Sequence, residues 1–228
     1  QEEASATPAE VLAPTPGEQV FDPCAAPGSK TTQLAALMDD TGMIVANDNN
    51  LGRLSALRSN AERCGVTNIA VTNGDARNFS IKPFTDDHHT PIFDRSLVDV
   101  PCSCEGTCRK NPTALQEWEY SHVQGIAGVQ KGILTRAIEA TKPGGSVVYA
   151  TCTFAPEENE AVLSHVLESE RVNCKMVPFD LPTPLTSVSG ITEWKNESYA
   201  PSVVSAHRIY PHLNDTGGFF CGKLEVLG

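Results

Sequence analysis

The chain has 228 residues, of which 40% are hydrophobic and 20% are charged, and this composition predicts one globular domain with a full core. Its formal net charge of -11 excludes a protein that holds nucleic acid by bulk attraction, because phosphate contacts come from Lys and Arg. Adaptation of the surface to high salt is an alternative cause of the acidity. No apolar run is long enough to span a bilayer, and residues 1–10 lack the features of a signal peptide, so we expect a cytoplasmic protein without membrane contact.

Strands and helices alternate along the chain. Residues 20–22 form a short apolar run, which is followed by a turn of small residues and by Leu34, Leu37 and Met38 at helical spacing. Further strands are expected at residues 42–48, 69–76, 95–102, 142–153 and 219–226, and further helices at residues 49–65, 112–140 and 155–169. This alternation predicts an α/β fold, in which helices cover both faces of a mostly parallel sheet.

The helix at 49–65 is expected to bury one apolar face and to end at Gly65. That face comprises Leu51, Leu54, Leu57 and Ala61. Residues 1–18 are expected to form a Pro-rich lead-in, and residues 180–215 an irregular excursion over the surface, because both are rich in residues that break helices and strands.

Acidic and small residues gather at the predicted carboxyl ends of the strands, which is where parallel sheets bind ligands. The turn "CAAPGSK" lacks the glycine patterns that hold nucleotide phosphates, but its Ala25, Ala26 and Gly28 would let a ligand approach the backbone. Asp48 is placed to accept hydrogen bonds from a ribose, so an adenosine-bearing ligand without essential phosphates fits both observations. Helix capping by Asp48 and plain packing by the small residues remain the alternatives.

The segment 99–112, "DVPCSCEGTCRKNP", contains three of the eight cysteines. A metal site, a disulfide and a reactive thiol are the candidate explanations. The absence of an export signal favours reduced thiols, and the spacing C-x-C-x3-C does not match the paired ligands of structural zinc sites. Cys102 and Cys152 both follow predicted strands at the ligand-facing edge, whereas Cys64, Cys174 and Cys221 are expected to be small buried residues.

Several motifs recur together over nearly the whole chain. In order they are "DPCAAPGSKT", "AND" followed by Arg53, "NGDAR", "DVPCSCEGTCRKNP", "KPGGSVVYATCTFAPEENEAV" and "TGGFF". Together they resemble the motifs of the Nol/Nop/Sun (RsmB/RsmF-like) family of RNA cytosine-5 methyltransferases. The form "DVPCS-EGT-RKNP" within residues 99–112 and the stretch "GITEW" are most similar to the tRNA-modifying branch of that family.

The resemblance implies a Rossmann-like class I methyltransferase fold, with a seven-stranded sheet whose last strand is antiparallel, and S-adenosyl-L-methionine as the cofactor. It implies one methyltransferase catalytic domain over residues 1–228, acting on RNA as a monomer. The family's usual upstream RNA-binding region is expected to be absent from this chain.

The resemblance also implies which residues bind the cofactor. The turn that would wrap its methionine and ribose comprises Cys24, Ala25, Ala26, Pro27, Gly28, Ser29 and Lys30. Asp48 would hold the ribose hydroxyls with help from Arg53, Asp75 would meet the adenine, and Asp99 would lie between the cofactor and the target base.

The implied catalytic residues are Cys152 as the nucleophile, Cys102 as the second cysteine that helps to release the product, and Asp99. Addition of a thiolate at carbon 6 of cytosine makes carbon 5 able to attack an electrophilic methyl group. Asp99 is expected to hold a proton beside ring nitrogen 3. Cys104 stands where the family usually has glycine, and a side chain there resists positive φ. No metal is expected.

Three other functions remain as alternatives. DNA cytosine methylation would use the proline-cysteine thiol as the nucleophile, and the "ATCT" motif argues against it. A non-catalytic RNA-binding or scaffold protein could retain the fold, and a nicotinamide dehydrogenase is least favoured because the glycine fingerprint is missing. Between RNA substrates, tRNA is favoured over rRNA. The basic residues expected along the RNA path are Lys30, Arg109, Lys110, Lys131 and Arg136.

Overall fold

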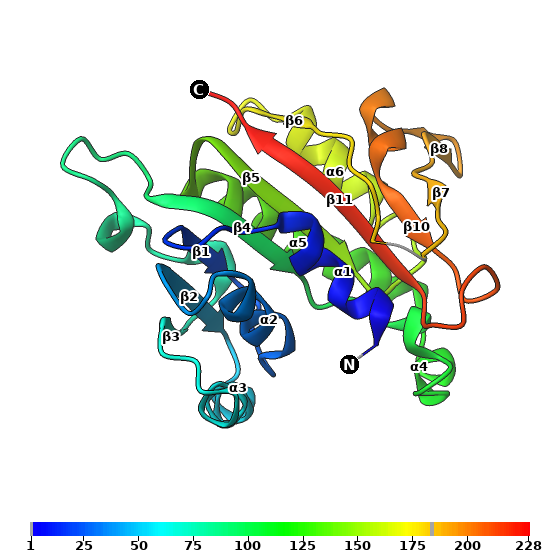
Figure 1. The fold of residues 1–228 in the computed structure, drawn as a ribbon. Helices are drawn as coiled ribbons and strands as arrows, with labels where there is room; N and C mark the ends of the chain where they lie inside the picture. Colours follow the sequence, from blue (N-terminus) through cyan, green and yellow to red (C-terminus); the bar gives the residue numbers. More distant parts are fainter. Residues whose placement is uncertain (1, 183–184) are drawn as a thin grey trace.

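The computed structural model describes residues 2–182 and 185–228, and one large sheet organises them (Figure 1). The parallel strands are β1 (Gln19–Asp22), β2 (Met43–Asp48), β3 (Ile69–Asn73), β4 (Phe93–Asp99) and β5 (Thr141–Thr151). The remaining strands are β6 (Cys174–Met176), β7 (Val188–Ser189), β8 (Glu193–Trp194), β9 (Glu197–Ser198), β10 (His207–Ile209) and β11 (Phe219–Val226).

Helices connect most of the strands. The α-helices are α1 (Glu3–Leu12), α2 (Ser29–Leu37), α3 (Leu51–Cys64), α4 (Thr113–Gln116), α5 (Tyr120–Ala140) and α6 (Glu160–Leu167). Short 3-10 helices lie at η1 (Ala76–Asn78), η2 (Lys82–Phe84), η3 (Glu105–Thr107) and η4 (Pro201–Ser205). Among residues 2–182 and 185–228, no helix is both long and apolar enough to cross a membrane.

The main sheet has the order β3-β2-β1-β4-β5-β11-β10-β7, and β6 also pairs with β11. Strands β1 to β5 pair with one another in parallel, whereas β11 runs antiparallel to β5. This confirms the mostly parallel sheet with an antiparallel last strand. Over the described residues the sheet contains nine strands, two more than the expected seven, because three short strands add to its edge: β6 and β10 both pair with β11, and β7 pairs with β10. Runs of two or three residues are too short to show an alternating pattern.

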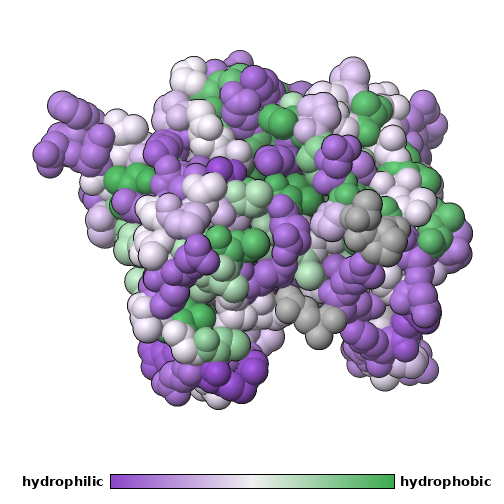
Figure 2. Space-filling view, in the orientation of Figure 1, coloured by the Kyte–Doolittle hydropathy of each residue, from purple (hydrophilic) through white to green (hydrophobic). Residues whose placement is uncertain are grey.

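Helices cover both faces of the sheet, as expected. Helices α1 and α2 lie in front of it in Figure 1, and α5 and α6 lie behind. Alternate residues of a strand therefore enter different cores: Leu97 packs with the α1 and α2 side chains, whereas its neighbour Val98 packs with those of α5 and α6. Figure 2 shows that hydrophilic residues cover most of the visible surface, with apolar residues in scattered patches.

Four expectations about local structure need correction. Within the lead-in, where no helix was expected, residues 3–12 form α1, which buries Ala9 and Leu12 against the sheet. The helix expected at 112–140 is two helices, α4 and α5, and the one expected at 155–169 begins only at Glu160. The excursion at 180–215 contains the short strands β7 to β10 and η4; residues 183–184 lie outside the described part.

Two residues of α3 are more exposed than expected. Leu51 is 72% exposed, because two steps of three residues rotate it about 120° away from Leu57 around the helix. Cys64, the last residue of α3, is also exposed, since the chain turns away at Gly65, which adopts a left-handed conformation. Leu54, Leu57 and Ala61 form the buried face and Gly65 ends the helix, as expected.

Candidate active site

The carboxyl ends of the parallel strands surround a cavity of about 330 Å³. Its walls include most of the residues that the sequence assigns to the site, namely Cys24, Ala26, Pro27, Asp48, Arg53, Asp75, Asp99, Cys102 and Cys152. Ala25, Ser29 and Lys30 line a separate pocket of about 30 Å³ at the same turn. These side chains come together because parallel strands end at one edge of the sheet.

Asp48 ends β2 and is only 2% exposed. One carboxylate oxygen accepts a hydrogen bond of 2.9 Å from the backbone N–H of Asn50, and the other lies 3.1 Å from a guanidinium nitrogen of Arg53. Arg53 also donates a hydrogen bond to the backbone carbonyl of Ala26. Arg53 therefore links the acid after β2 to the turn after β1, on one wall of the cavity.

Asp75 follows β3 and caps the 3-10 helix η1. Arg77 donates to both of its oxygens, from Nε at 3.0 Å and from a terminal nitrogen at 2.6 Å, and these hydrogen bonds lower the pKa of Asp75. The sequence reasoning missed some cavity residues, namely Asn49, Gly74, Ala76, Arg77, Val129 and Ile133. Three of them adjoin a predicted acid in the chain and Arg77 lies two positions from one, so closeness to a strand end is the signal that could have found these four.

The turn between β1 and α2 is closed by tight packing at Gly28. This residue has a φ of +100°, and a Cβ atom there would lie 2.6 Å from Cδ1 of Leu57 on α3. Only glycine combines this backbone conformation with so close an approach. Gly28 therefore sets the position of Ser29 and Lys30 at the start of α2 without a side chain of its own.

Lys30 and Asp99 form an ion pair, with Nζ lying 2.8 Å from Oδ2. Burial lowers the pKa of Lys30, but the charge of Asp99 and its hydrogen bond outweigh burial and raise it, so the ammonium form is retained. Both residues line a second cavity of about 150 Å³ with Phe219 and Cys152. Asp99 and Cys152 thus belong to the walls of both cavities and mark their junction.

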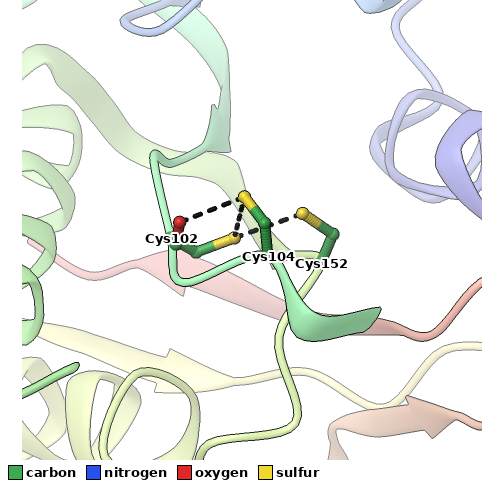
Figure 3. Close-up of side chains that lie close together, drawn as sticks. All are labelled: Cys102, Cys104 and Cys152. Carbon is green, nitrogen blue, oxygen red and sulfur yellow. Dashed lines mark hydrogen bonds between the residues drawn. The ribbon is translucent and has the colours of Figure 1, made fainter. Parts of the chain in front are cut away.

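Three cysteine side chains converge at this junction, and their sulfur atoms point toward one another (Figure 3). The sulfurs of Cys102 and Cys152 are 3.2 Å apart, although the residues are fifty positions apart in the chain. The sulfurs of Cys102 and Cys104 are 3.7 Å apart. Cys104 has a φ of +62°, so its backbone takes the left-handed conformation typical of the glycine that the family usually has there.

The hydrogen bonds within this cluster set the thiol pKa values. Contacts with Cys104 and Cys152, together with burial, raise the pKa of Cys102. Hydrogen bonds from Cys102 and Cys152 lower the pKa of Cys104. For Cys152, a hydrogen bond from Cys102 lowers the pKa, but the contact with Cys104, burial and the charge of Asp99 outweigh it and raise the pKa. The contacts of the cluster therefore favour ionisation of Cys104 and disfavour ionisation of Cys102 and Cys152.

Two buried glutamates join the loop of Cys102 to the loop of Cys152. Glu105 accepts hydrogen bonds from the Thr153 hydroxyl at 2.6 Å and the Phe154 backbone N–H at 2.8 Å. Glu158 accepts from the Ser103 backbone N–H at 3.1 Å, and burial raises its pKa. Sequence reasoning did not single out either glutamate, because its partners lie about fifty residues away.

The loops also touch through their backbones. The N–H of Gly106 donates to the carbonyl of Cys152 at 2.9 Å, and the N–H of Gly218 donates to the carbonyl of Gly106 at 2.8 Å. A Cβ atom at Gly106 would lie 2.6 Å from both the Cys152 and the Gly218 carbonyl oxygens. Glycine at this position is what allows the two cysteine-bearing loops to meet.

Comparison with known proteins gives a consistent result. The family model described as 16S rRNA methyltransferase RsmB/F matches residues 9–225. Ribosomal RNA small subunit methyltransferase F of Aeromonas salmonicida is 40% identical over 206 residues, which cover 90% of this chain and 40% of that protein. The tRNA (cytosine(49)-C(5))-methyltransferase of Pyrococcus abyssi is 37% identical over 225 residues, which cover 99% of this chain and 69% of that protein.

Solved structures agree in fold. A methyltransferase homolog protein from Pyrococcus horikoshii matches with a TM-score of 0.84 and 32% identity, over 100% of this chain and 67% of that one. The crystal structure of NSun6 from Pyrococcus horikoshii with SFG matches with a TM-score of 0.81 and 29% identity, over 100% of this chain and 53% of that one. This chain spans about two fifths of the length of the rRNA methyltransferase F relatives. The family model and these relatives show that the chain belongs to the 16S rRNA methyltransferase RsmB/F family.

Proposed function

We propose that this protein transfers a methyl group from S-adenosyl-L-methionine to carbon 5 of a cytosine in RNA, through a covalent adduct with Cys152. The observation that carries the proposal is the meeting of the Cys102 and Cys152 sulfurs, 3.2 Å apart, near the junction of a larger and a smaller cavity. Methyl transfer needs the cofactor and the target base to be held side by side, with a sulfur nucleophile next to the base.

The larger cavity fits the cofactor in size and in chemistry. Its volume of about 330 Å³ lies within the range of about 300–1,000 Å³ for small-molecule sites. Three carboxylates, from Asp48, Asp75 and Asp99, line it. Such a lining repels phosphates but suits a ligand with a sulfonium charge and hydroxyl donors. SFG, bound in the NSun6 structure, is an analogue of S-adenosylmethionine.

We assign the remaining cofactor contacts by position. Asp48, held by Arg53, receives the ribose hydroxyls, and Asp75 lies where the adenine is bound. Residues 24–30 wrap the methionine and ribose portions. When bound, S-adenosylmethionine would supply an electrophilic methyl group.

We place the target base in the smaller cavity, the one of about 150 Å³ that Lys30, Asp99 and Cys152 line. The Cys152 thiolate adds to carbon 6, which makes carbon 5 nucleophilic. Addition develops negative charge at ring nitrogen 3, and the Lys30 ammonium, 2.8 Å from Asp99, supplies through Asp99 the proton that neutralises it. After methyl transfer Cys102 assists removal of the carbon-5 proton, and elimination then frees Cys152.

The proposed substrate is a tRNA with an unpaired or flipped cytosine, since a base stacked in a duplex cannot reach a buried thiol. The match to the tRNA methyltransferase of Pyrococcus abyssi covers 69% of that protein and supports this choice. Near the smaller cavity Arg109 pairs with Asp215 and Lys110 pairs with Glu2. Phosphates of the RNA can replace these two carboxylates as partners of the basic side chains. Arg136 instead bonds Glu139 and the Phe79 carbonyl, so we leave it out of the RNA path.

We further propose that residues 1–228 act as one catalytic domain, and that its charge of -11 makes RNA binding weak and sensitive to salt. Filter binding of labelled tRNA across a salt series tests this. Tight binding that does not change with salt would contradict it.

A pair of cysteine variants tests the reaction itself. Cys152→Ala should lose methyl transfer, whereas Cys102→Ala should accumulate a covalent complex with RNA that survives denaturing electrophoresis. The substrate is identified by mass-spectrometric mapping of 5-methylcytosine in tRNA and rRNA incubated with each protein. Full methylation by Cys152→Ala would refute the proposal, and the reverse pattern in the two variants would indicate the chemistry of DNA cytosine methyltransferases. Calorimetry that detects no binding of S-adenosylmethionine would favour the non-catalytic alternative.

A further inference from the structure

The three-cysteine cluster has a property that the methylation reaction does not use. The reaction needs two thiols, and the structure holds a third, Cys104, beside them. The sulfurs of Cys102, Cys104 and Cys152 all lie within 4.8 Å of one another. Across the described part of the chain, this is the one place where three Cys, His, Asp or Glu ligand atoms gather so closely.

Two of the three sulfur separations are close to those of a tetrahedral metal site, and the third is at most 4.8 Å. A zinc–thiolate bond is about 2.3 Å long, so two sulfurs on one tetrahedral zinc are about 3.8 Å apart. The separation of 3.7 Å between Cys102 and Cys104 already matches this value. The separation of 3.2 Å between Cys102 and Cys152 requires the sulfurs to part by about half an ångström, which a small side-chain rotation supplies.

The backbone prepares the site. Cys104 adopts a φ of +62°, and its thiol donates a hydrogen bond of 3.1 Å to the carbonyl of Cys102, which holds the sulfur on the cluster side. Glu105 ties this loop to the segment after Cys152. The spacing C-x-C in the loop gives no zinc signature, because the third ligand comes from the end of β5, fifty residues further along.

We propose that Cys102, Cys104 and Cys152 bind a thiophilic divalent cation, Zn²⁺, as three thiolates, with the fourth position open to water. All three ligands bind as thiolates, so each thiol that is still protonated releases its proton to solvent, and no oxidation state changes. Three thiolates and Zn²⁺ carry a net charge of -1, and the Lys30 ammonium, which pairs with Asp99, lines the same cavity as Cys152. If the proposed methyl transfer is correct, the occupied site is inactive, since a zinc-bound Cys152 sulfur no longer adds to cytosine.

Cobalt provides a direct measurement of the site. Reduced, metal-free protein titrated with Co²⁺ should develop thiolate-to-cobalt charge-transfer bands and intense tetrahedral d–d bands at one equivalent, and Zn²⁺ should displace them. Cys104→Gly should bind at least about tenfold more weakly, while Cys108→Ser, in the same loop but outside the cluster, should bind like the wild type. Glycine suits the left-handed backbone, so we expect the Cys104→Gly protein to melt no lower than the wild type.

Equal affinity in Cys104→Gly, or a wild-type spectrum without thiolate bands, would overturn the proposal. A second arm measures methylation with and without Zn²⁺: the wild type and Cys108→Ser should be inhibited and recover with a chelator, and Cys104→Gly should resist. Metal binding in a protein that never methylates RNA would leave this site standing and refute the proposed function. Methylation without metal binding would do the opposite.

Discussion

The Lys30 ammonium nitrogen lies 2.8 Å from a carboxylate oxygen of Asp99, which joins the turn after β1 to the end of β4. In the proposed reaction Asp99 therefore acts together with Lys30, which carries the proton of the pair in the structure. We regard the two side chains as one unit at the junction of the cavities.

Substitution of Lys30 tests this unit. Lys30→Gln removes the ammonium but keeps a polar side chain, and we expect the single-turnover rate of methyl transfer to fall on the order of a hundredfold, as for loss of one preorganised donor. Lys175→Gln is the matched control, because Lys175 forms a comparable pair with Glu225 on the surface. An unchanged rate in Lys30→Gln would exclude the ammonium from the reaction.

The pH dependence of the reaction should depend on Cys104. Since the contact with Cys104, burial and the charge of Asp99 raise the pKa of Cys152 overall, its thiolate fraction, and with it the rate of adduct formation, should still increase with pH above neutrality. Cys104→Gly removes one cause of this rise, so the profile should move to lower pH. Rates measured from pH 6 to 9 at constant ionic strength, with Cys108→Ser as the control, test the direction. A shift to higher pH would contradict the assignment.

Asp22 should make stability depend on pH. It is fully buried, and burial, with the charge of Asp99, raises its pKa to about 7 although a hydrogen bond from Thr31 opposes the change. A raised folded-state pKa favours the folded state at low pH, and this advantage is lost as pH rises from about 4 through 7. Asp22→Asn keeps the shape and hydrogen bonds of the protonated acid.

We therefore expect Asp22→Asn to match the wild type in free energy of unfolding near pH 4 and to exceed it above pH 7, by up to about 4 kcal/mol. Chemical denaturation of both proteins at pH 4.5 and pH 8 gives the comparison. A variant that is less stable than the wild type at pH 8 would show that Asp22 is charged and well paired in the fold.

Gly106 offers a test of how closely the cysteine loops must meet. Gly106→Ala places a Cβ atom 2.6 Å from two backbone carbonyls, so the loops must separate. We expect the methyl-transfer rate to fall on the order of a hundredfold, with a loss of stability of about 1–3 kcal/mol. Gly125→Ala on α5, where nothing lies within 4 Å, should keep the rate and gain about 0.5–1 kcal/mol. Rate and unfolding free energy measured together separate the two effects.

Local patterns were sufficient to predict the main elements. The strand at Met43–Asp48 and the glycine stop at Gly65 follow from apolar runs and turn residues, which depend only on near neighbours in the chain. The rotation of Leu51 out of the buried face was also present in the spacing, and a count by 100° per residue would have found it. The two- and three-residue strands beyond β11 are stabilised by pairing and carry no local signal.

The α/β class and the approximate position of the site follow from the residue pattern, because acids and cysteines that follow parallel strands must meet at one edge of the sheet. Which side chains touch depends on the folded arrangement of the chain. The pairing of Lys30 with Asp99 and the addition of Cys104 to the cluster depend on strand register and on the packing of loops around Gly106. Shifts of an ångström decide such contacts between residues far apart in the chain, and no pattern of residue types encodes them.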